Sequence, residues 1–167
     1  MKDNFDACLA NVLKNEGGWA DDPRDPGGAT MEGITMKTFQ GFIGREASKD
    51  ELRNIPNETR DAIYRQMFWD PIKGDSLDSG IDAVVMDHAV NAGVHRAQNL
   101  AASIVGSPAY DVDAINSYGA DKFVADFTEG RANYYRSLKI FAIYGKGWLR
   151  RAALTSDLAL KLINNEA

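Results

Sequence analysis

The sequence predicts an α+β protein that is predominantly α-helical, with one small β-hairpin or loop region near the N-terminus. Three observations support this fold class. Apolar residues recur at the three- and four-residue spacing of amphipathic helices over most of the 167 residues. Five of the fifteen glycines and two of the five prolines lie within residues 17–33. No internal repeat or long linker divides the chain, so a single domain is expected.

The first helix is predicted from about residue 5 to the glycines at 17–18, because apolar side chains at positions 5, 8, 9, 12 and 13 share one helix face. Asp3 or Asn4 can cap its start, and the glycines at 17–18 can end it. Residues 17–33 then predict an irregular loop or a short β-hairpin, since two Asp-Pro pairs and a Gly-Gly pair favour tight turns.

Helical signals resume after residue 33. Thr35 can cap a short helix, and Ser48 with Glu51 has the spacing of a capping box. Further helices are predicted from Asn57, over 81–92 up to Gly93, over 97–104, over 123–141 with a weak point at Gly130, and from about Trp148 to Leu162.

Composition excludes several classes of protein. With 44% hydrophobic and 26% charged residues, the chain is neither disordered nor collagen-like. It has no run of about 18 apolar residues, so no membrane span is expected. The N-terminus lacks the apolar segment of a secretory signal, and the single cysteine, Cys8, cannot form an internal disulfide. We therefore expect synthesis in a reducing cytoplasm.

Charge gives one further hypothesis about partners. The formal net charge is −5, so nucleic acid is not an expected partner. Residues Arg131–Arg151 nevertheless hold six basic side chains and no acidic one, interleaved with aromatic residues. This strip predicts binding to an anionic cell-envelope surface, and the alternative is a solvated helix face.

Glu16 is the strongest candidate for a catalytic acid. It lies four residues after Val12 and three after Leu13, so it continues the apolar stripe at the end of the first helix. Partial burial and the negative end of the helix dipole both disfavour a charged carboxylate there. A carboxyl group that keeps its proton suits general acid catalysis. The alternative is a Glu side chain that turns into solvent at a frayed helix end.

Asp25 and Thr30 are candidates for the second polar group that a glycosidase needs. They lie nine and fourteen residues after Glu16, in the turn-rich segment. A loop that folds back over the helix end would bring one of them close to the acid. The alternative for Asp25 is a residue that caps backbone groups of a turn. No metal site is expected, because His88 and His95 lack the context of a zinc site.

These residues resemble the N-terminal signature of glycoside hydrolase family 108. The Glu-Gly-Gly-Trp sequence at 16–19 is similar to the family's E-G-G-Y motif, and Asp-Pro-Arg-Asp-Pro-Gly-Gly-Ala-Thr at 22–30 and Gly-Ile-Thr at 33–35 follow in order. The resemblance covers the chain from about Leu9 to Leu154. Members of this family are N-acetylmuramidases, commonly phage endolysins or prophage-encoded lysozymes.

The resemblance implies a lysozyme-like fold formed by residues 1–167. Within it, a catalytic half is expected at about 9–90 and a helical, peptidoglycan-binding-like half at about 91–167. Because the resemblance places the catalytic machinery in the first half, the second half is expected to contribute contacts to the cell wall.

The resemblance also implies roles for particular residues. Glu16 is expected to be the catalytic acid, and by analogy with phage lysozymes Asp25 and Thr30 hold the attacking water. Trp19 and Asn91 are expected to bind substrate. The alternative for Asn91 is a helix C-cap before the following glycine.

We therefore expect a monomeric peptidoglycan hydrolase that cleaves the β-1,4 bond between N-acetylmuramic acid and N-acetylglucosamine without a cofactor. It would be made in the host cytoplasm without a signal peptide and act on peptidoglycan in the periplasm or cell wall. A lytic transglycosylase uses the same acid and remains an alternative. A non-catalytic peptidoglycan-binding or secretion-accessory protein is the alternative from a different class.

Overall fold

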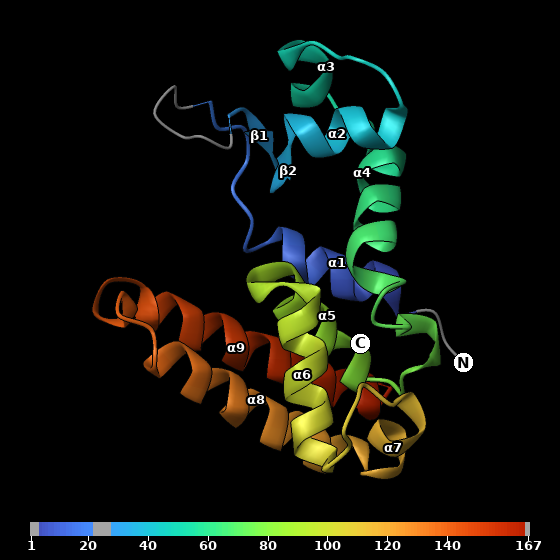
Figure 1. Ribbon diagram of the computed structural model, residues 1–167, viewed down its shortest axis with the longest axis vertical. Coiled ribbons are helices and arrows are strands. Elements are labelled where there is room, and N and C mark those ends of the chain that lie inside the picture. The colour runs from blue at the N-terminus through green and yellow to red at the C-terminus, as the bar shows by residue number, and fades with distance from the viewer. Residues whose placement is uncertain (1–3, 22–27, 166–167) are drawn as a thin grey trace.

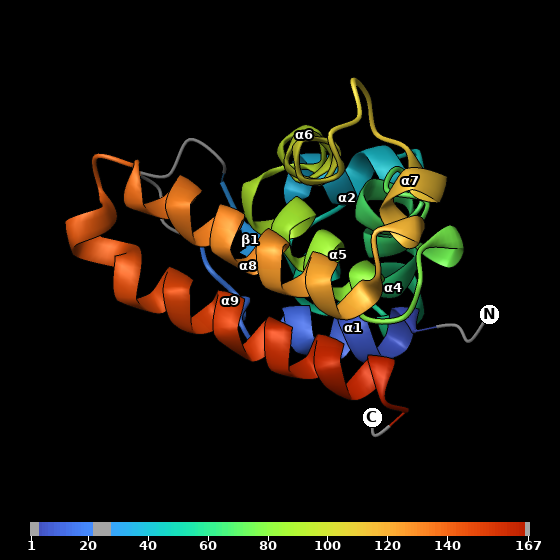
Figure 2. The same ribbon diagram turned by 90° about the horizontal axis from the view of Figure 1, so that it is seen from below.

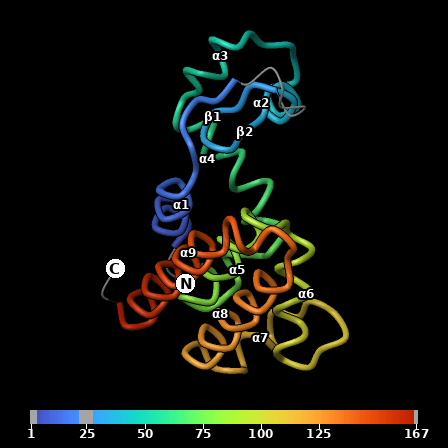
Figure 3. Tube along the Cα trace, turned by 90° about the vertical axis from the view of Figure 1, so that its left-hand side faces the viewer, coloured from blue at the N-terminus to red at the C-terminus, as the bar shows by residue number. Residues whose placement is uncertain are grey.

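The computed structural model describes residues 4–21 and 28–165, and these form two lobes that meet at the first helix, α1 (Phe5–Leu13). The small lobe lies at the top of Figures 1 and 3 and the large lobe below it. The small lobe consists of β1 (Thr30–Met31), β2 (Ile34–Thr35), α2 (Met36–Ile43), α3 (Lys49–Arg53) and α4 (Asn57–Tyr64), which runs into a short π-helical turn, η1 (Arg65–Trp69).

The large lobe is helical and is arranged around α5. After a short 3-10 turn, η2 (Gly74–Ser76), it consists of α5 (Ile81–Ala92), α6 (Val94–Val105), α7 (Val112–Ser117), α8 (Ala120–Arg136) and α9 (Phe141–Ile163). Helix α5 packs against α1, α6, α8 and α9, and its residues from Ile81 to Ala89 are buried. Helices α8 and α9 lie side by side along the base of the molecule (Figure 2). The predominantly helical α+β fold class with one small hairpin is confirmed.

Several helix boundaries confirm the local signals in the sequence. Thr35 caps α2 by accepting a hydrogen bond from the backbone N–H of Thr38 at 3.2 Å. Ser48 and Glu51 form both hydrogen bonds of the capping box at the start of α3. Helix α5 ends at Gly93, as predicted.

The predicted helix over 123–141 is wrong at its end, because α8 ends at Arg136 and Phe141 begins α9. Helix α8 continues through Gly130, the predicted weak point, where a Cβ would lie 2.8 Å from Leu100 of α6. The glycine therefore allows a close approach of these two helices. The last helix begins at Phe141, seven residues before the predicted start near Trp148.

The start of α1 also differs from the prediction. Asn4 occupies the N-cap position, but its side chain makes no capping bond. It donates instead to Asp82 Oδ2 of α5 at 2.8 Å and to Ser79 Oγ at 3.0 Å. The other predicted cap, Asp3, lies outside the described residues. The first helix is thus attached to α5 by a long-range contact. None of the helices described is long and apolar enough to cross a membrane.

Candidate active site

Glu16 lies just beyond the end of α1, where the two lobes meet. The helix ends at Leu13, before the Gly17–Gly18 pair, and the backbone N–H of Glu16 still donates to the carbonyl oxygen of Leu13 at 3.3 Å. Its side chain is only 20% exposed. The carboxyl group therefore does not turn into bulk solvent, which was the alternative for a glutamate at a frayed helix end.

An arginine from α9 holds the Glu16 carboxyl group. Arg151 Nη1 donates to Glu16 Oε1 at 3.0 Å. The same guanidinium group uses Nε and Nη2 to contact both oxygens of Asp87, with Nη2 at 3.0 Å from Asp87 Oδ1. Asp87 also forms an ion pair with Arg131, whose Nη2 lies 2.6 Å from Asp87 Oδ2. Glu16, just beyond the end of α1, and the charged side chains of Asp87, Arg131 and Arg151 from α5, α8 and α9 thus form one chain of ion pairs.

The ionised state of Asp87 depends on its two arginines. The side chain is 1% exposed, and this burial by itself opposes the charged form. The guanidinium groups of Arg131 and Arg151 outweigh the effect of burial and hold the pKa of Asp87 below its usual range. Burial likewise opposes the charge on Arg151, but Asp87 and Glu16 raise the pKa of this guanidinium. Asp87 therefore anchors a permanent cation beside Glu16.

The turn of the β-hairpin covers the opposite side of the Glu16 carboxyl group. Gly33 has φ +76°, and a Cβ there would lie 3.1 Å from both Glu16 Oε2 and Tyr64 Oη. Tyr64 Oη donates to the backbone carbonyl of Glu32 at 2.7 Å, which holds the turn in place. The Glu32 carboxylate itself pairs with Arg60 at 3.2 Å. A residue without a side chain is needed at Gly33 because the turn approaches the acid so closely.

A small cavity of about 80 Å³ lies between the turn and the large lobe. Glu16 and Gly33 line it together with Thr38, Tyr64 and Val90, among mostly apolar neighbours. The Glu16 carboxyl group thus has a guanidinium on one side and a confined, largely apolar space on the other. The sequence predicted the apolar surroundings but not the cationic partner.

Thr30 lies in the hairpin whose turn covers Glu16. It pairs with Thr35 across the sheet, and its backbone exchanges two hydrogen bonds with Ala20, at 2.8 and 2.9 Å. The segment after Glu16 is therefore fastened to β1. Asp25, the other residue predicted to hold water, lies outside the described residues.

The two residues predicted to bind substrate lie in different lobes. Trp19 is partly buried beside the small lobe, where the guanidinium of Arg53 lies 5.7 Å from its ring centre. Asn91 lies near the end of α5 and accepts a hydrogen bond from the hydroxyl group of Tyr135 through Oδ1. The C-cap position of α5 is occupied by Gly93, so Asn91 does not have the capping role considered as its alternative.

Asp87, Arg131 and Arg151 were not singled out as site residues from the sequence alone. One signal was available for Asp87, because it interrupts the apolar run of a helix predicted to be buried, and a buried carboxylate needs cationic partners. Nothing in the local sequence identifies those partners, which lie 44 and 64 residues further along the chain.

The same contacts correct the predicted basic strip. Its first and last residues, Arg131 and Arg151, are buried in ion pairs with Asp87 and offer no charge to an external surface. Arg136 pairs with Glu129 at 3.0 Å. The exposed cations of the strip are therefore Lys139, Lys146 and Arg150, together with the ion-paired Arg136.

Comparison with known proteins identifies the family. A family model described as glycosyl hydrolase 108 matches residues 9–93, half of the chain, and this range includes Glu16, Gly33 and Asp87. The chain belongs to glycosyl hydrolase family 108. The family predicted from the motifs at 16–35 is thereby confirmed.

A solved structure is similar over almost the whole of this family 108 chain. The structure of Brucella abortus SagA matches with a TM-score of 0.82 and 31% sequence identity, covering 98% of this chain and 97% of that one. No curated protein matches the sequence. The two matches confirm the lysozyme-like fold class and support a peptidoglycan hydrolase. Among the described residues, no group of three or more His, Cys, Asp or Glu side chains could hold a metal ion.

Proposed function

We propose that this protein is an N-acetylmuramidase that hydrolyses the β-1,4 bond between N-acetylmuramic acid and N-acetylglucosamine, with Glu16 as general acid. The position of the Glu16 carboxyl group carries the proposal. It lies between the two lobes, its side chain is one-fifth exposed, Arg151 holds it, and the turn at Gly33 covers it. A general acid must be positioned within hydrogen-bond reach of the leaving oxygen, and this arrangement restricts where the carboxyl group can go.

Arg151 acts as a positioning residue in this mechanism. Because Asp87 binds two of its nitrogens, its remaining nitrogen meets Glu16 Oε1 in a defined direction. Oxygen Oε2 is then directed toward the hairpin turn. We propose that this oxygen delivers the proton to the glycosidic oxygen. Groups held in place before the substrate arrives lower the barrier, because little reorganisation is needed during the reaction.

The remaining roles follow from the residues around this acid. We propose that Asp25 and Thr30 hold the attacking water, which is supported by the place of Thr30 in the hairpin that covers Glu16. Trp19 and Asn91 are proposed to contact sugars on the small-lobe and large-lobe sides. Proton transfer together with electrostatic stabilisation accounts for glycoside cleavage without a cofactor.

The division of labour along the chain is also part of the proposal. Residues of about 9–90 supply the acid and the hairpin, and residues of about 91–167 supply wall contacts as well as Arg131 and Arg151. Lys139, Lys146 and Arg150 are the exposed cations that would meet an anionic envelope. The protein would act on peptidoglycan in the periplasm or cell wall.

The variant Glu16→Gln tests the proposal, because it keeps the shape of the side chain and an oxygen that can accept from Arg151. We expect the rate of clearing of purified peptidoglycan to fall by about 10²- to 10⁴-fold, the usual contribution of a positioned proton donor. Glu46→Gln, at an exposed position of the small lobe, is the matched control and should clear at the wild-type rate.

Two outcomes would overturn the assignment. One is a Glu16→Gln variant that clears peptidoglycan as fast as the control. The other comes from mass spectrometry of the wild-type products. Hydrolysis leaves a reducing N-acetylmuramic acid end, whereas an anhydro ring would identify a lytic transglycosylase, and binding without released fragments would identify a non-catalytic wall protein.

A further inference from the structure

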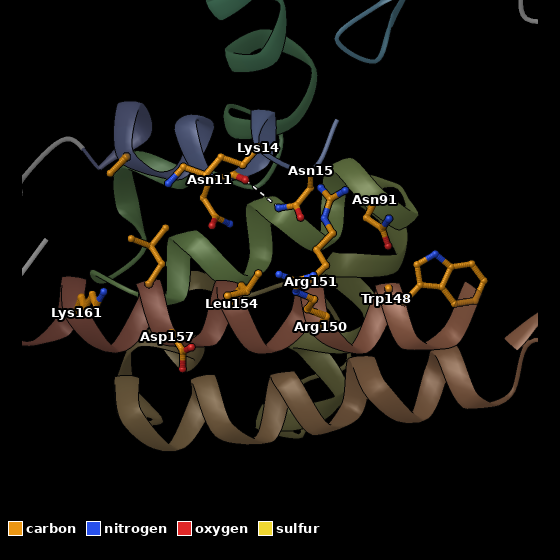
Figure 4. A pocket seen from close by; sticks show the side chains of 13 residues that line it. Asn11, Lys14, Asn15, Asn91, Trp148, Arg150, Arg151, Leu154, Asp157 and Lys161 are labelled. Carbon is orange, nitrogen blue, oxygen red and sulfur yellow. Dashed lines mark hydrogen bonds between the residues drawn. The ribbon is translucent and has the colours of Figure 1, made fainter. Parts of the chain in front are cut away.

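A groove of about 830 Å³ runs between α1 and α9 (Figure 4). Asn11, Lys14 and Asn15 line it from α1, and Trp148, Arg151 and Lys161 are among the residues that line it from α9. At 1.5 Å per residue, the stretch of α9 from Trp148 to Lys161 is about 20 Å long. The groove shares Arg151 and Asn91 with the proposed active site, and it is long enough to hold an extended chain of about five or six residues.

The groove is cationic on a protein whose net charge is −5. Four basic side chains line it against one acidic side chain, Asp157. Arg151 is already ion-paired with Asp87 and Glu16. The other three, Lys14, Arg150 and Lys161, form no ion pair with any described residue. Ammonium and guanidinium groups left unpaired along one groove are suited to several carboxylates at spaced positions.

One end of the groove reaches the proposed active site. Asn15, which lines the groove, immediately precedes Glu16 in the chain, and Arg151, which also lines it, donates to Glu16 at 3.0 Å. In Figure 4 the Arg151 side chain extends from α9 toward Asn15 at the end of α1, and Lys161 lies at the far end of the groove. A ligand in the groove would thus extend away from the acid along α9.

We propose that this groove binds the peptide branch of the substrate through its carboxylates. The inference rests on the proposed function, because it takes the substrate to be peptidoglycan. In the peptide-bearing strand the lactyl carboxyl of each muramic acid is taken up in the amide bond to the peptide, so the sugars themselves carry no charge that would match a row of cations. The peptide is attached to the muramic acid sugar, next to the cleaved bond, and it carries several carboxylates. Its place on the sugar and its charge both fit a cationic groove that passes Arg151, the partner of Glu16.

The test compares two substrates prepared from the same glycan strands, with peptides present and after their removal by an amidase. Wild-type protein should cleave the peptide-bearing strands faster. In the double variant Lys14→Gln, Lys161→Gln the ratio of the two rates should fall about tenfold, since two charge-assisted contacts are weakened. Lys122→Gln, at an exposed position near the start of α8, removes one charge away from the groove and should keep the wild-type ratio.

A binding measurement separates this proposal from the muramidase activity. A soluble peptide of alanine, glutamate and diaminopimelate is titrated into wild-type protein and the double variant, with inorganic phosphate as the comparison anion at equal ionic strength. Binding of the peptide that weakens in the double variant supports the groove even if no sugar bond is cleaved. Equal rates on both substrates, an unchanged ratio in the double variant, or phosphate that competes as well as the peptide would overturn it.

Discussion

Helix α5 buries two aspartates and satisfies them with different partners. Near the start of the helix, Asp82 is 2% exposed and, among the described residues, receives hydrogen bonds only from neutral donors. These are the side chain of Asn4 at 2.8 Å and the backbone N–H groups of Gly80 and Ala83 at 2.8 and 2.7 Å. Burial raises the pKa of Asp82 to about 6, against the effect of these donors.

In the middle of α5, Asp87 is equally buried but has two guanidinium partners. Their charge keeps its pKa below the usual range in spite of burial. The two aspartates show that neutral donors are enough where an aspartate only joins two helices, as Asp82 joins α5 to the start of α1. Cations are needed where the carboxylate must orient another charged group, as Asp87 orients Arg151 toward Glu16.

The largest effect is expected from Asp87→Asn. The carboxamide would leave Arg131 buried without a counterion and Arg151 with Glu16 alone, and breaking buried ion pairs in this way lowers the free energy of unfolding by about 3–5 kcal/mol. Urea denaturation at pH 7 measures the loss, and peptidoglycan clearing should fall with it because Arg151 loses its anchor. A loss no larger than that of Asp82→Asn would contradict the distinction between the two aspartates.

A smaller effect is expected from His88→Phe, one residue after Asp87. The ring of His88 is fully buried against Phe127, Tyr134 and Tyr135, and neither of its nitrogens has a hydrogen-bond partner among the described residues. Burial, with help from Arg131, lowers its pKa to about 3 from 6.5. Between pH 6.5 and about pH 3 the unfolded chain therefore binds a proton on His88 that the folded protein does not bind. The free energy of unfolding falls as the pH falls below 6.5.

The variant His88→Phe should remove that acid sensitivity. Relative to wild type, its free energy of unfolding should improve by about 2 kcal/mol between pH 7 and pH 5, at about 1.4 kcal/mol per pH unit below 6.5. The measurement is urea denaturation of both proteins across this range. Parallel pH curves for the two proteins would show that His88 does not titrate as its burial indicates.

The smallest effect at neutral pH is expected from Asp82→Asn. Its folded pKa of about 6 lies above the ordinary 3.8, so the stability that the proton contributes is present at low pH and is lost as the pH rises through about 6. At pH 7 the variant loses one acceptor for Asn4 but no longer buries a charge, and its stability should stay within about 1 kcal/mol of wild type. At pH 4 it should be less stable than wild type by a larger margin. An equal margin at both pH values would refute the raised pKa.

Features that depend on neighbouring residues were predictable from the sequence. The cap at Thr35, the capping box of Ser48 and Glu51, and the end of α5 at Gly93 each need partners within a few residues, and all three are confirmed. The family was predictable for a related reason, because the motifs that identify it lie in one short segment, 16–35. Glu16 was expected at the end of the first helix, but α1 ends at Leu13 and Glu16 lies just beyond it.

Only the tertiary structure decided which groups meet across long distances in the chain. Arg151 is 135 residues from Glu16 and 64 from Asp87, and no periodicity or local motif connects them. Asn4 is a good helix cap by residue type, yet it bonds to Asp82 because α5 packs against α1. Local patterns determine helices and turns through contacts within a few residues, whereas the partners of a buried charge are chosen by the packing of whole helices.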